Sequence, residues 1–156
     1  MSRLQFLKVN SDVAEDMLKL KVRDSQQHLI ASNAEWIIED SFNEDSVCFG
    51  MYDDDLPVGM IALIDPRLVG DDNGHFQAQH LYIWRLMIDE ASQSKGYGKA
   101  AMCFAKQYAE LIGLVGLSLT TMDTEAENAL NFYQALGFIP TGRRLDGEIE
   151  LIYTQK

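Results

Sequence analysis

A loop that could hold phosphate groups lies at Gln93-Ser94-Lys95-Gly96-Tyr97-Gly98-Lys99. Its two glycines let the backbone come close to a ligand, and Lys95 and Lys99 add positive charge. If a helix begins near Gly98, the free N–H groups of its first turn lie at the positive end of the helix dipole and can bind phosphate oxygens. The alternative is an ordinary strand-to-helix turn in which glycine only relieves strain.

The residues on either side of this loop predict the elements that position it. Leu81–Asp89 carries one interior charge, Arg85, and is otherwise aromatic or aliphatic, as in a central strand covered on both faces. After the loop, apolar residues recur at three- and four-residue spacing as far as Ile112, and Gly113 is a typical helix stop. We therefore expect a strand, a phosphate-binding loop and an amphipathic helix.

Two general phosphate-loop patterns fit this loop poorly. The Walker pattern G-x-x-x-x-G-K-[ST] is absent. Gly96–Ala101 satisfies the relaxed dinucleotide pattern G-x-G-x-x-A, but that loop normally follows its strand directly and has an acidic residue about 20 positions on. Strand-like residues, Leu117–Thr120, lie there instead. A dinucleotide-binding protein is therefore the weaker interpretation.

The loop Gln93-x-x-Gly96-x-Gly98 resembles the Q/R-x-x-G-x-G/A pyrophosphate loop of the GNAT superfamily of N-acetyltransferases. A second segment, Ala129–Phe138, is similar to the A-x-x-x-Y-x-x-x-G-F pattern of that family. The resemblance covers most of the chain and implies a single GNAT-like domain over residues 1–156. The implied fold is α/β: a mixed, mostly antiparallel sheet with a central βαβ crossover and flanking helices.

The resemblance also implies the chemistry, which is direct transfer of an acetyl group from acetyl-CoA to a primary amine. Tyr133 aligns with the family's tyrosine that assists the departing thiolate. Backbone N–H groups near Leu86 to Ile88 would stabilise the tetrahedral intermediate. The residues expected to bind acetyl-CoA are Leu86, Met87, Ile88, Gln93, Ser94, Lys95, Gly96, Tyr97, Gly98, Lys99 and Asn128.

Two features leave the catalytic apparatus open. The family commonly has asparagine where this chain has Ala126, and Asn128 could replace it. No general base is evident, and His80 or a water-mediated contact from Glu35 or Glu39 are candidates. A non-catalytic acyl-CoA-binding sensor or interaction module is therefore the alternative to an enzyme.

The acceptor is expected to be a small cationic amine, such as the polyamines spermidine and spermine. Ile30–Glu35 and Tyr82–Asp89 resemble the bacterial spermine/spermidine acetyltransferase branch. Ammonium groups could pair with carboxylates and lie over an indole ring. The alternative is that these acids form a solvated helix face. The residues expected to bind the acceptor are Glu35, Trp36, Glu39 and Trp84.

The composition narrows the partners. The 156 residues suit one domain, and 24 acidic against 13 basic side chains give a formal charge of −11. Such a surface disfavours nucleic acid and would attract a cationic small molecule. The alternative is that the acidity only keeps the protein soluble, unless a site concentrates the charge. The chain has no Cys/His cluster with zinc spacing, so no metal is expected, and both Cys48 and Cys103 are expected to be buried, reduced thiols.

No apolar run approaches membrane-spanning length, so we expect a cytoplasmic protein. Family members often form homodimers, but the sequence indicates no interface.

The remaining pattern predicts further strands and helices. A helix capped by Asp12 should include Val22, and another should begin at Ser32 or Asn33. A third helix should run from a cap at Thr124 to Leu136. The other predicted strands are Leu4–Val9, Ser46–Tyr52, Val58–Ile64, Val115–Thr121, one starting at Phe138-Ile139, and Glu148–Tyr153 after an Asp146-Gly147 turn.

Overall fold

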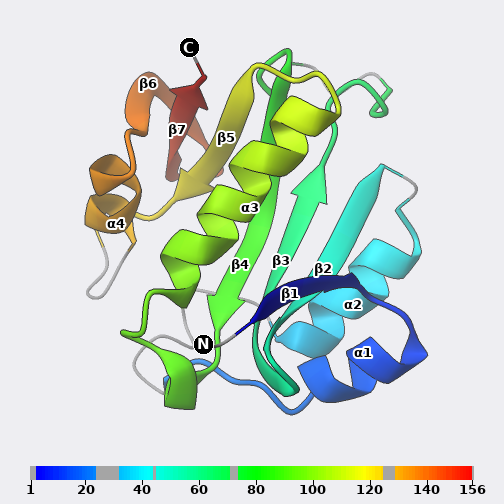
Figure 1. Cartoon of the computed structure of the whole chain (residues 1–156). Coiled ribbons are helices and arrows are strands. Elements are labelled where there is room, and N and C mark those ends of the chain that lie inside the picture. Colours follow the sequence, from blue (N-terminus) through cyan, green and yellow to red (C-terminus); the bar gives the residue numbers. More distant parts are fainter. Residues whose placement is uncertain (1–2, 24–31, 44, 71–73, 125–128, 156) are drawn as a thin grey trace.

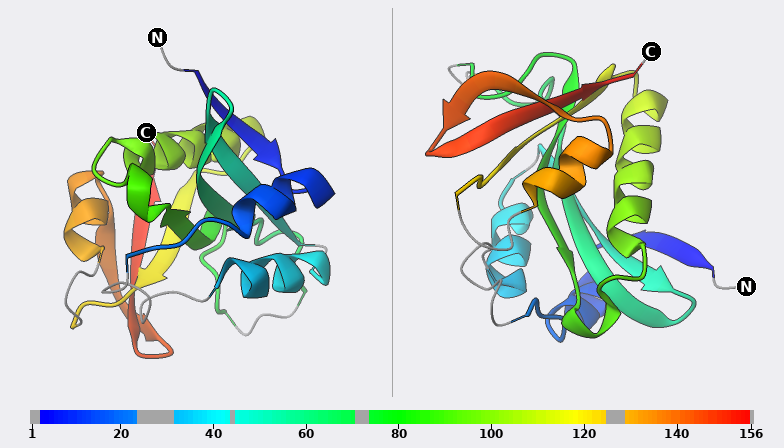
Figure 2. Two further views of the ribbon diagram at one scale, coloured as in Figure 1. Left: turned by 90° about the horizontal axis from the view of Figure 1, so that it is seen from below. Right: turned by 90° about the vertical axis from the view of Figure 1, so that its left-hand side faces the viewer.

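A seven-stranded sheet with helices on both faces forms the molecule (Figures 1 and 2). The computed structural model describes residues 3–23, 32–43, 45–70, 74–124 and 129–155. The strands are β1 (Leu4–Lys8), β2 (Ser46–Asp53), β3 (Leu56–Ile64), β4 (His80–Ile88), β5 (Gly116–Thr121), β6 (Ile139–Leu145) and β7 (Glu148–Thr154). The helices are α1 (Ser11–Met17), α2 (Asn33–Ser41), α3 (Tyr97–Leu111) and α4 (Leu130–Ala135), with a 3₁₀ turn, η2 (Glu90–Ser92), before α3.

One pair of neighbouring strands, in the centre of the sheet, is parallel. Its strand order is β1-β2-β3-β4-β5-β7-β6, and every neighbouring pair is antiparallel except β4 with β5. Helix α3 makes the crossover between these two parallel strands, so the predicted mixed sheet and βαβ unit are confirmed. The parallel pairing extends only from His80 opposite Gly116 to Tyr82 opposite Ser118. Beyond Tyr82 the two strands separate and the sheet opens (Figure 1).

Each face of the sheet has its own core. Helices α3 and α4 cover one face, and α1 and α2 cover the other (Figure 2). Strand β3 shows the alternation most clearly, because Ile61 and Leu63 join the α3 core while Met60 and Ala62 join the α1–α2 core. The nearly continuous apolar sequence of the central strands follows from this burial on both sides.

A β-bulge in β4 decides which side chains point toward α3. Leu63 pairs with Ile83 and Ala62 pairs with Arg85, so Trp84 is an extra residue in β4. An insertion of one residue reverses the facing of everything after it. Leu86 and Ile88 therefore pack against the α3 core, whereas Trp84 and Met87 lie on the α1–α2 side.

Helix α1 differs from the predicted helix at both ends, whereas α2 begins as predicted. Helix α1 is capped by Asn10, which accepts the N–H of Val13 at 3.0 Å, and not by Asp12. The helix ends at Met17, so Val22 lies outside it. The predicted Ser32 cap of α2 is confirmed, because its hydroxyl accepts the N–H of Glu35.

Further corrections concern the second half of the chain. Helix α4 begins at Leu130 after an Ala129 cap, so Thr124 does not cap it, and residues 125–128 lie outside the described part. Cys48 is buried as expected, but Cys103 is exposed because it lies on the solvent side of α3. None of the helices in the described ranges combines the length and apolar character needed to cross a membrane.

Candidate active site

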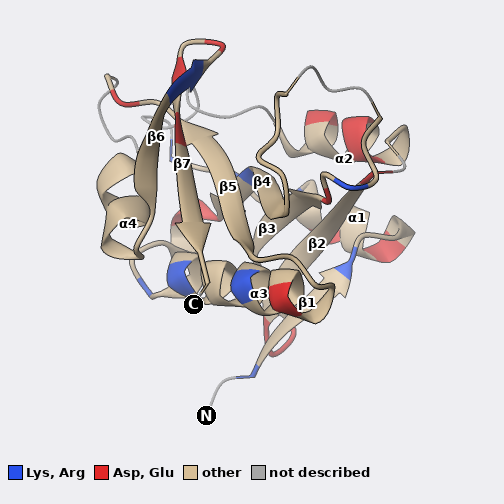
Figure 3. Ribbon diagram, turned by 90° about the horizontal axis from the view of Figure 1, so that it is seen from above, with Lys and Arg blue, Asp and Glu red and all other residues tan. Residues whose placement is uncertain are grey.

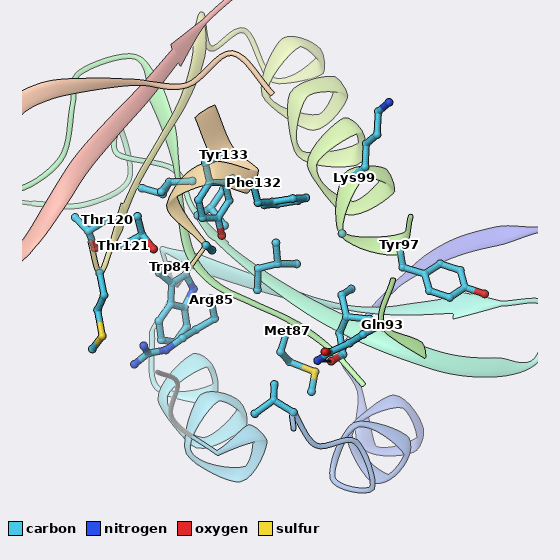
Figure 4. Close-up of a pocket in the computed structure, with 18 of the residues that line it drawn as sticks. Trp84, Arg85, Met87, Gln93, Tyr97, Lys99, Thr120, Thr121, Phe132 and Tyr133 are labelled. Atoms are coloured by element: carbon cyan, nitrogen blue, oxygen red, sulfur yellow. Dashed lines mark hydrogen bonds between the residues drawn. The ribbon is translucent and has the colours of Figure 1, made fainter. Parts of the chain in front are cut away.

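A cleft of about 510 Å³ lies where β4 and β5 separate (Figure 4). This volume is typical of a small-molecule site. Beyond Tyr82, no described strand pairs with the β5-facing edge of β4, so backbone groups on that edge are open to the cleft. The walls come from β4, the η2–α3 loop, the end of β5, α4 and the first residue of β7.

The first turn of α3 presents free backbone donors at one end of the cleft. The first hydrogen bond of the helix runs from the Ala100 N–H to the Gly96 carbonyl, at 3.1 Å. The N–H groups of Tyr97, Gly98 and Lys99 therefore have no acceptor within the helix. Since they lie at the positive end of the helix dipole, they are suited to bind an anionic phosphate.

The two glycines of this loop are required for different reasons. Gly96 caps α3 with a φ of 86°, a left-handed conformation in which other L-residues are strained. At Gly98, an added Cβ would lie 3.2 Å from the ring of Phe132 on α4. Gly96 thus makes the turn, and Gly98 lets α4 pack beside the donors.

Two side chains fix the loop to the sheet. The Gln93 amide donates a hydrogen bond to the Ile88 carbonyl at 3.1 Å, which ties the loop to the end of β4. On the other side, the Tyr97 hydroxyl donates to the carboxylate of Asp53 at the end of β2. The donors of the α3 first turn are thus held against β4 and against the β2–β3 hairpin.

Tyr97→Phe is expected to raise the Kd for CoA about threefold, because the start of α3 loses its tie to Asp53. Isothermal titration with CoA measures the effect. The matched control is Tyr108→Phe, the same change on the same helix at a residue outside the cleft lining. Equal affinities for Tyr97→Phe and Tyr108→Phe would show that the Asp53 contact does not position the loop.

Tyr133 places a phenol in the cleft from α4. Its ring packs at an angle on Phe132 and Phe138, with centroids 5.2 and 5.7 Å apart, and its hydroxyl points into the cleft (Figure 4). Burial raises the pKa of Tyr133 from the ordinary tyrosine value of about 10 to about 12. The hydroxyl therefore keeps its proton at neutral pH and can serve as a donor.

Most of the residues predicted to bind acetyl-CoA line this cleft. Lys95 is an exposed residue of the loop that does not line the cleft, and Asn128 lies outside the described residues. No group of three or more potential metal ligands occurs within the described ranges. The predicted residues that line the cleft are Leu86, Met87, Ile88, Gln93, Ser94, Gly96, Tyr97, Gly98 and Lys99.

The predicted acceptor residues are arranged differently from expectation. Trp84 lines the cleft, but Trp36 is 0% exposed and offers no ring face to a substrate, contrary to the expectation from the sequence. The guanidinium of Arg85 occupies the cation–π position instead, 5.3 Å from the Trp84 ring centroid and 5.9 Å from that of Trp36. It also lies 3.8 Å from the Glu39 carboxylate. Neither Glu35 nor Glu39 belongs to the cleft lining.

The candidate base His80 lies at the wrong end of β4. Its ring nitrogens contact the Ala78 carbonyl at 2.8 Å and the Thr154 hydroxyl at 3.0 Å, so it ties the closed end of the sheet together. A carboxylate that sequence reasoning missed, Glu148, does line the cleft. The Asp146-Gly147 signal predicted its hairpin, but nothing in the sequence placed β7 beside β5.

The family assignment follows from comparison with known proteins. A model of the acetyltransferase (GNAT) family matches residues 12–138 of the 156. The chain therefore belongs to the acetyltransferase (GNAT) family, whose enzymes use acetyl-CoA as the acetyl donor. No curated protein matches the chain in sequence.

Solved structures share the fold at low sequence identity. An acetyltransferase from Thermus thermophilus is 18% identical, with a TM-score of 0.75 over 97% of this chain and 96% of that chain. The PaiA N-acetyltransferase of Thermoplasma acidophilum, solved with coenzyme A, is 16% identical, with a TM-score of 0.69 over 97% and 99%. A Bacillus subtilis acetyltransferase in complex with CoA is 18% identical, with a TM-score of 0.66 over 100% of both chains. The single-domain α/β architecture is thus that of this family.

Proposed function

We propose that this chain transfers the acetyl group of acetyl-CoA to a primary amine of a small acceptor bound in the cleft between β4 and β5. One observation carries the proposal: the free N–H groups of the α3 first turn and the Tyr133 hydroxyl line the same cleft. The first group suits a diphosphate, and the second suits a departing thiolate. The placement of this donor in the cleft favours a transferase over a site that only binds the coenzyme.

Binding of the diphosphate at the start of α3 would fix the position of the thioester. With the diphosphate on the N–H groups of residues 97–99, the rest of the coenzyme extends along the open edge of β4. The thioester then lies beside the backbone of Leu86 to Ile88, where N–H groups stabilise the oxyanion of the tetrahedral intermediate. The bulge at Trp84 supports this placement, because it turns Leu86 and Ile88 toward α3.

The reaction needs a neutral amine and a stabilised leaving group. The amine attacks the thioester carbon, a C–N bond forms, and collapse of the intermediate breaks the C–S bond. The pKa of a thiol is about 8.5, well below that of buried Tyr133 at about 12. Full proton transfer from Tyr133 to the thiolate is therefore unfavourable. Tyr133 acts chiefly by donating a hydrogen bond to the sulfur as negative charge develops there.

We propose a polyamine as the acceptor. The net charge of −11 and the acidic positions along α2 favour a cationic substrate (Figure 3). The resemblance of Tyr82–Asp89 to the spermine/spermidine branch supports the same choice. The contacts differ from those first expected, because Trp36 is buried and Arg85 already covers Trp84.

A substrate panel tests the proposal. Release of free thiol from acetyl-CoA is followed with spermidine, spermine, aminoglycosides and amino acids as acceptors. Turnover with spermidine or spermine supports the polyamine, and turnover only with another amine keeps the transferase but changes its substrate. Stabilisation by CoA in a thermal-shift assay without turnover would indicate a binding module, and stabilisation by NAD instead would indicate a dinucleotide site.

A further inference from the structure

Glu148 is the only carboxylate among the described residues that line the cleft. It is the first residue of β7, directly after the turn that joins β6 to β7, and β7 pairs with β5. Glu148 therefore faces the cleft from the β5 side, across the opening from β4. The other charged lining residues are Arg85 and Lys99.

A chain of hydroxyl groups holds this carboxylate in place. The Thr120 hydroxyl donates a hydrogen bond to Glu148 Oε2 at 3.2 Å, and the Tyr82 hydroxyl lies 3.2 Å from the same Thr120 oxygen. Because Thr120 gives its proton to Glu148, Tyr82 must donate to Thr120. No described residue donates a hydrogen bond to Glu148 Oε1, and Glu148 lines the cleft.

The charges around Glu148 leave its carboxylate available for a cation. Arg85 on β4 also lines the cleft, and its guanidinium pairs with Glu39 and stacks on Trp84. On β6, Arg144 is 2.6 Å from Asp123 and also donates to the Gly147 carbonyl. Besides Arg85 and Lys99, the titratable side chains that share the cleft with Glu148 are those of Tyr82, Tyr97 and Tyr133.

We propose that Glu148 binds the ammonium group of the acceptor and takes its proton. The inference rests on the proposed acetyl transfer and assigns the base that reaction lacks. One N–H bond of the ammonium breaks, and its proton passes to Oε1 of Glu148, directly or through one water molecule. The nitrogen lone pair then forms the C–N bond, the C–S electrons leave with sulfur, and the second proton lost by nitrogen balances the one that the thiol gains.

Glu148→Gln tests this role, because the change keeps the size of the side chain and removes its charge. At pH 7 we expect kcat/KM for the amine to fall about 100-fold, with the Kd for CoA and the Tm unchanged. The loss should shrink as the pH approaches the pKa of a free amine, about 10. Much of the amine in solution is then already neutral and needs no base. A structural role for Glu148 would give a loss independent of pH.

Two further variants complete the test. Asp146→Asn removes the same charge from the same hairpin outside the cleft lining and should leave turnover unchanged. Glu148→Asp keeps a carboxylate and should retain more activity than Glu148→Gln. The assignment would be overturned if Glu148→Gln turned over as fast as the wild type. It would also be overturned if the loss had the same size at pH 7 and at pH 10. Absence of wild-type turnover on the whole amine panel would instead contradict the transferase proposal.

Discussion

Tyr133→Phe should lower kcat by about 10- to 100-fold while the Kd for acetyl-CoA stays the same. The hydroxyl points into the cleft, where the leaving thiolate is proposed to form, and the ring is held by Phe132 and Phe138 (Figure 4). The variant keeps those ring contacts and loses only the donor. Steady-state kinetics with a saturating amine, together with titration of CoA, separates the two effects.

Tyr153→Phe provides the matched control for Tyr133→Phe. Tyr153 also packs against Phe138, at a centroid distance of 5.8 Å, but it does not line the cleft. Its loss of a hydroxyl should leave kcat unaltered. Equal turnover for wild type and Tyr133→Phe would remove Tyr133 from the mechanism.

The pH profile of the wild type gives a second view of Tyr133. A donor must be protonated, and burial raises the pKa of Tyr133 to about 12. The rate should therefore rise with pH as the amine loses its proton, and no fall attributable to Tyr133 should occur below about pH 11. A descending limb near pH 8 or 9 in kcat would indicate that another group is the donor.

Gly96→Ala is expected to weaken CoA binding by about tenfold or more. Gly96 has a φ of 86°, and a Cβ in that conformation costs about 1–2 kcal/mol, which favours rearrangement of the turn that aims the N–H groups of residues 97–99. The affinity loss follows from displacement of these donors from the diphosphate. Calorimetric titration with CoA measures the affinity, and thermal unfolding measures the strain.

Gly142→Ala is a closely matched control for Gly96→Ala. Gly142 has a φ of 91°, and at both glycines an added Cβ would meet no other atom within 4 Å. The two variants should therefore lose similar stability, while only Gly96→Ala loses affinity for CoA. Equal CoA affinities in the two variants would contradict a diphosphate site at the start of α3.

Local sequence patterns predicted those parts of the fold that depend on neighbouring residues. The loop at Gln93–Lys99 carries its own conformational requirement, because Gly96 must have a positive φ and α3 must follow. The apolar period before Gly113 and the Asp146-Gly147 turn are equally local. These patterns predicted α3, the βαβ crossover and the final hairpin, which the structure confirms.

The features that the sequence did not predict depend on contacts between distant segments. The bulge at Trp84 arises from pairing between β3 and β4, and no residue type near Trp84 indicates it. The burial of Trp36 depends on how α2 docks on the sheet. Glu148 reaches the cleft because β7 inserts between β5 and β6. The residue pattern of β7 would suit a strand at the edge of the sheet equally well.

A crystal structure of this chain with CoA tests the central claim most directly. We expect the diphosphate on the N–H groups of Tyr97, Gly98 and Lys99, at about 2.7–3.2 Å, and the CoA sulfur beside the Tyr133 hydroxyl. A diphosphate bound elsewhere, or a sulfur separated from Tyr133 by the width of the sheet, would contradict the account.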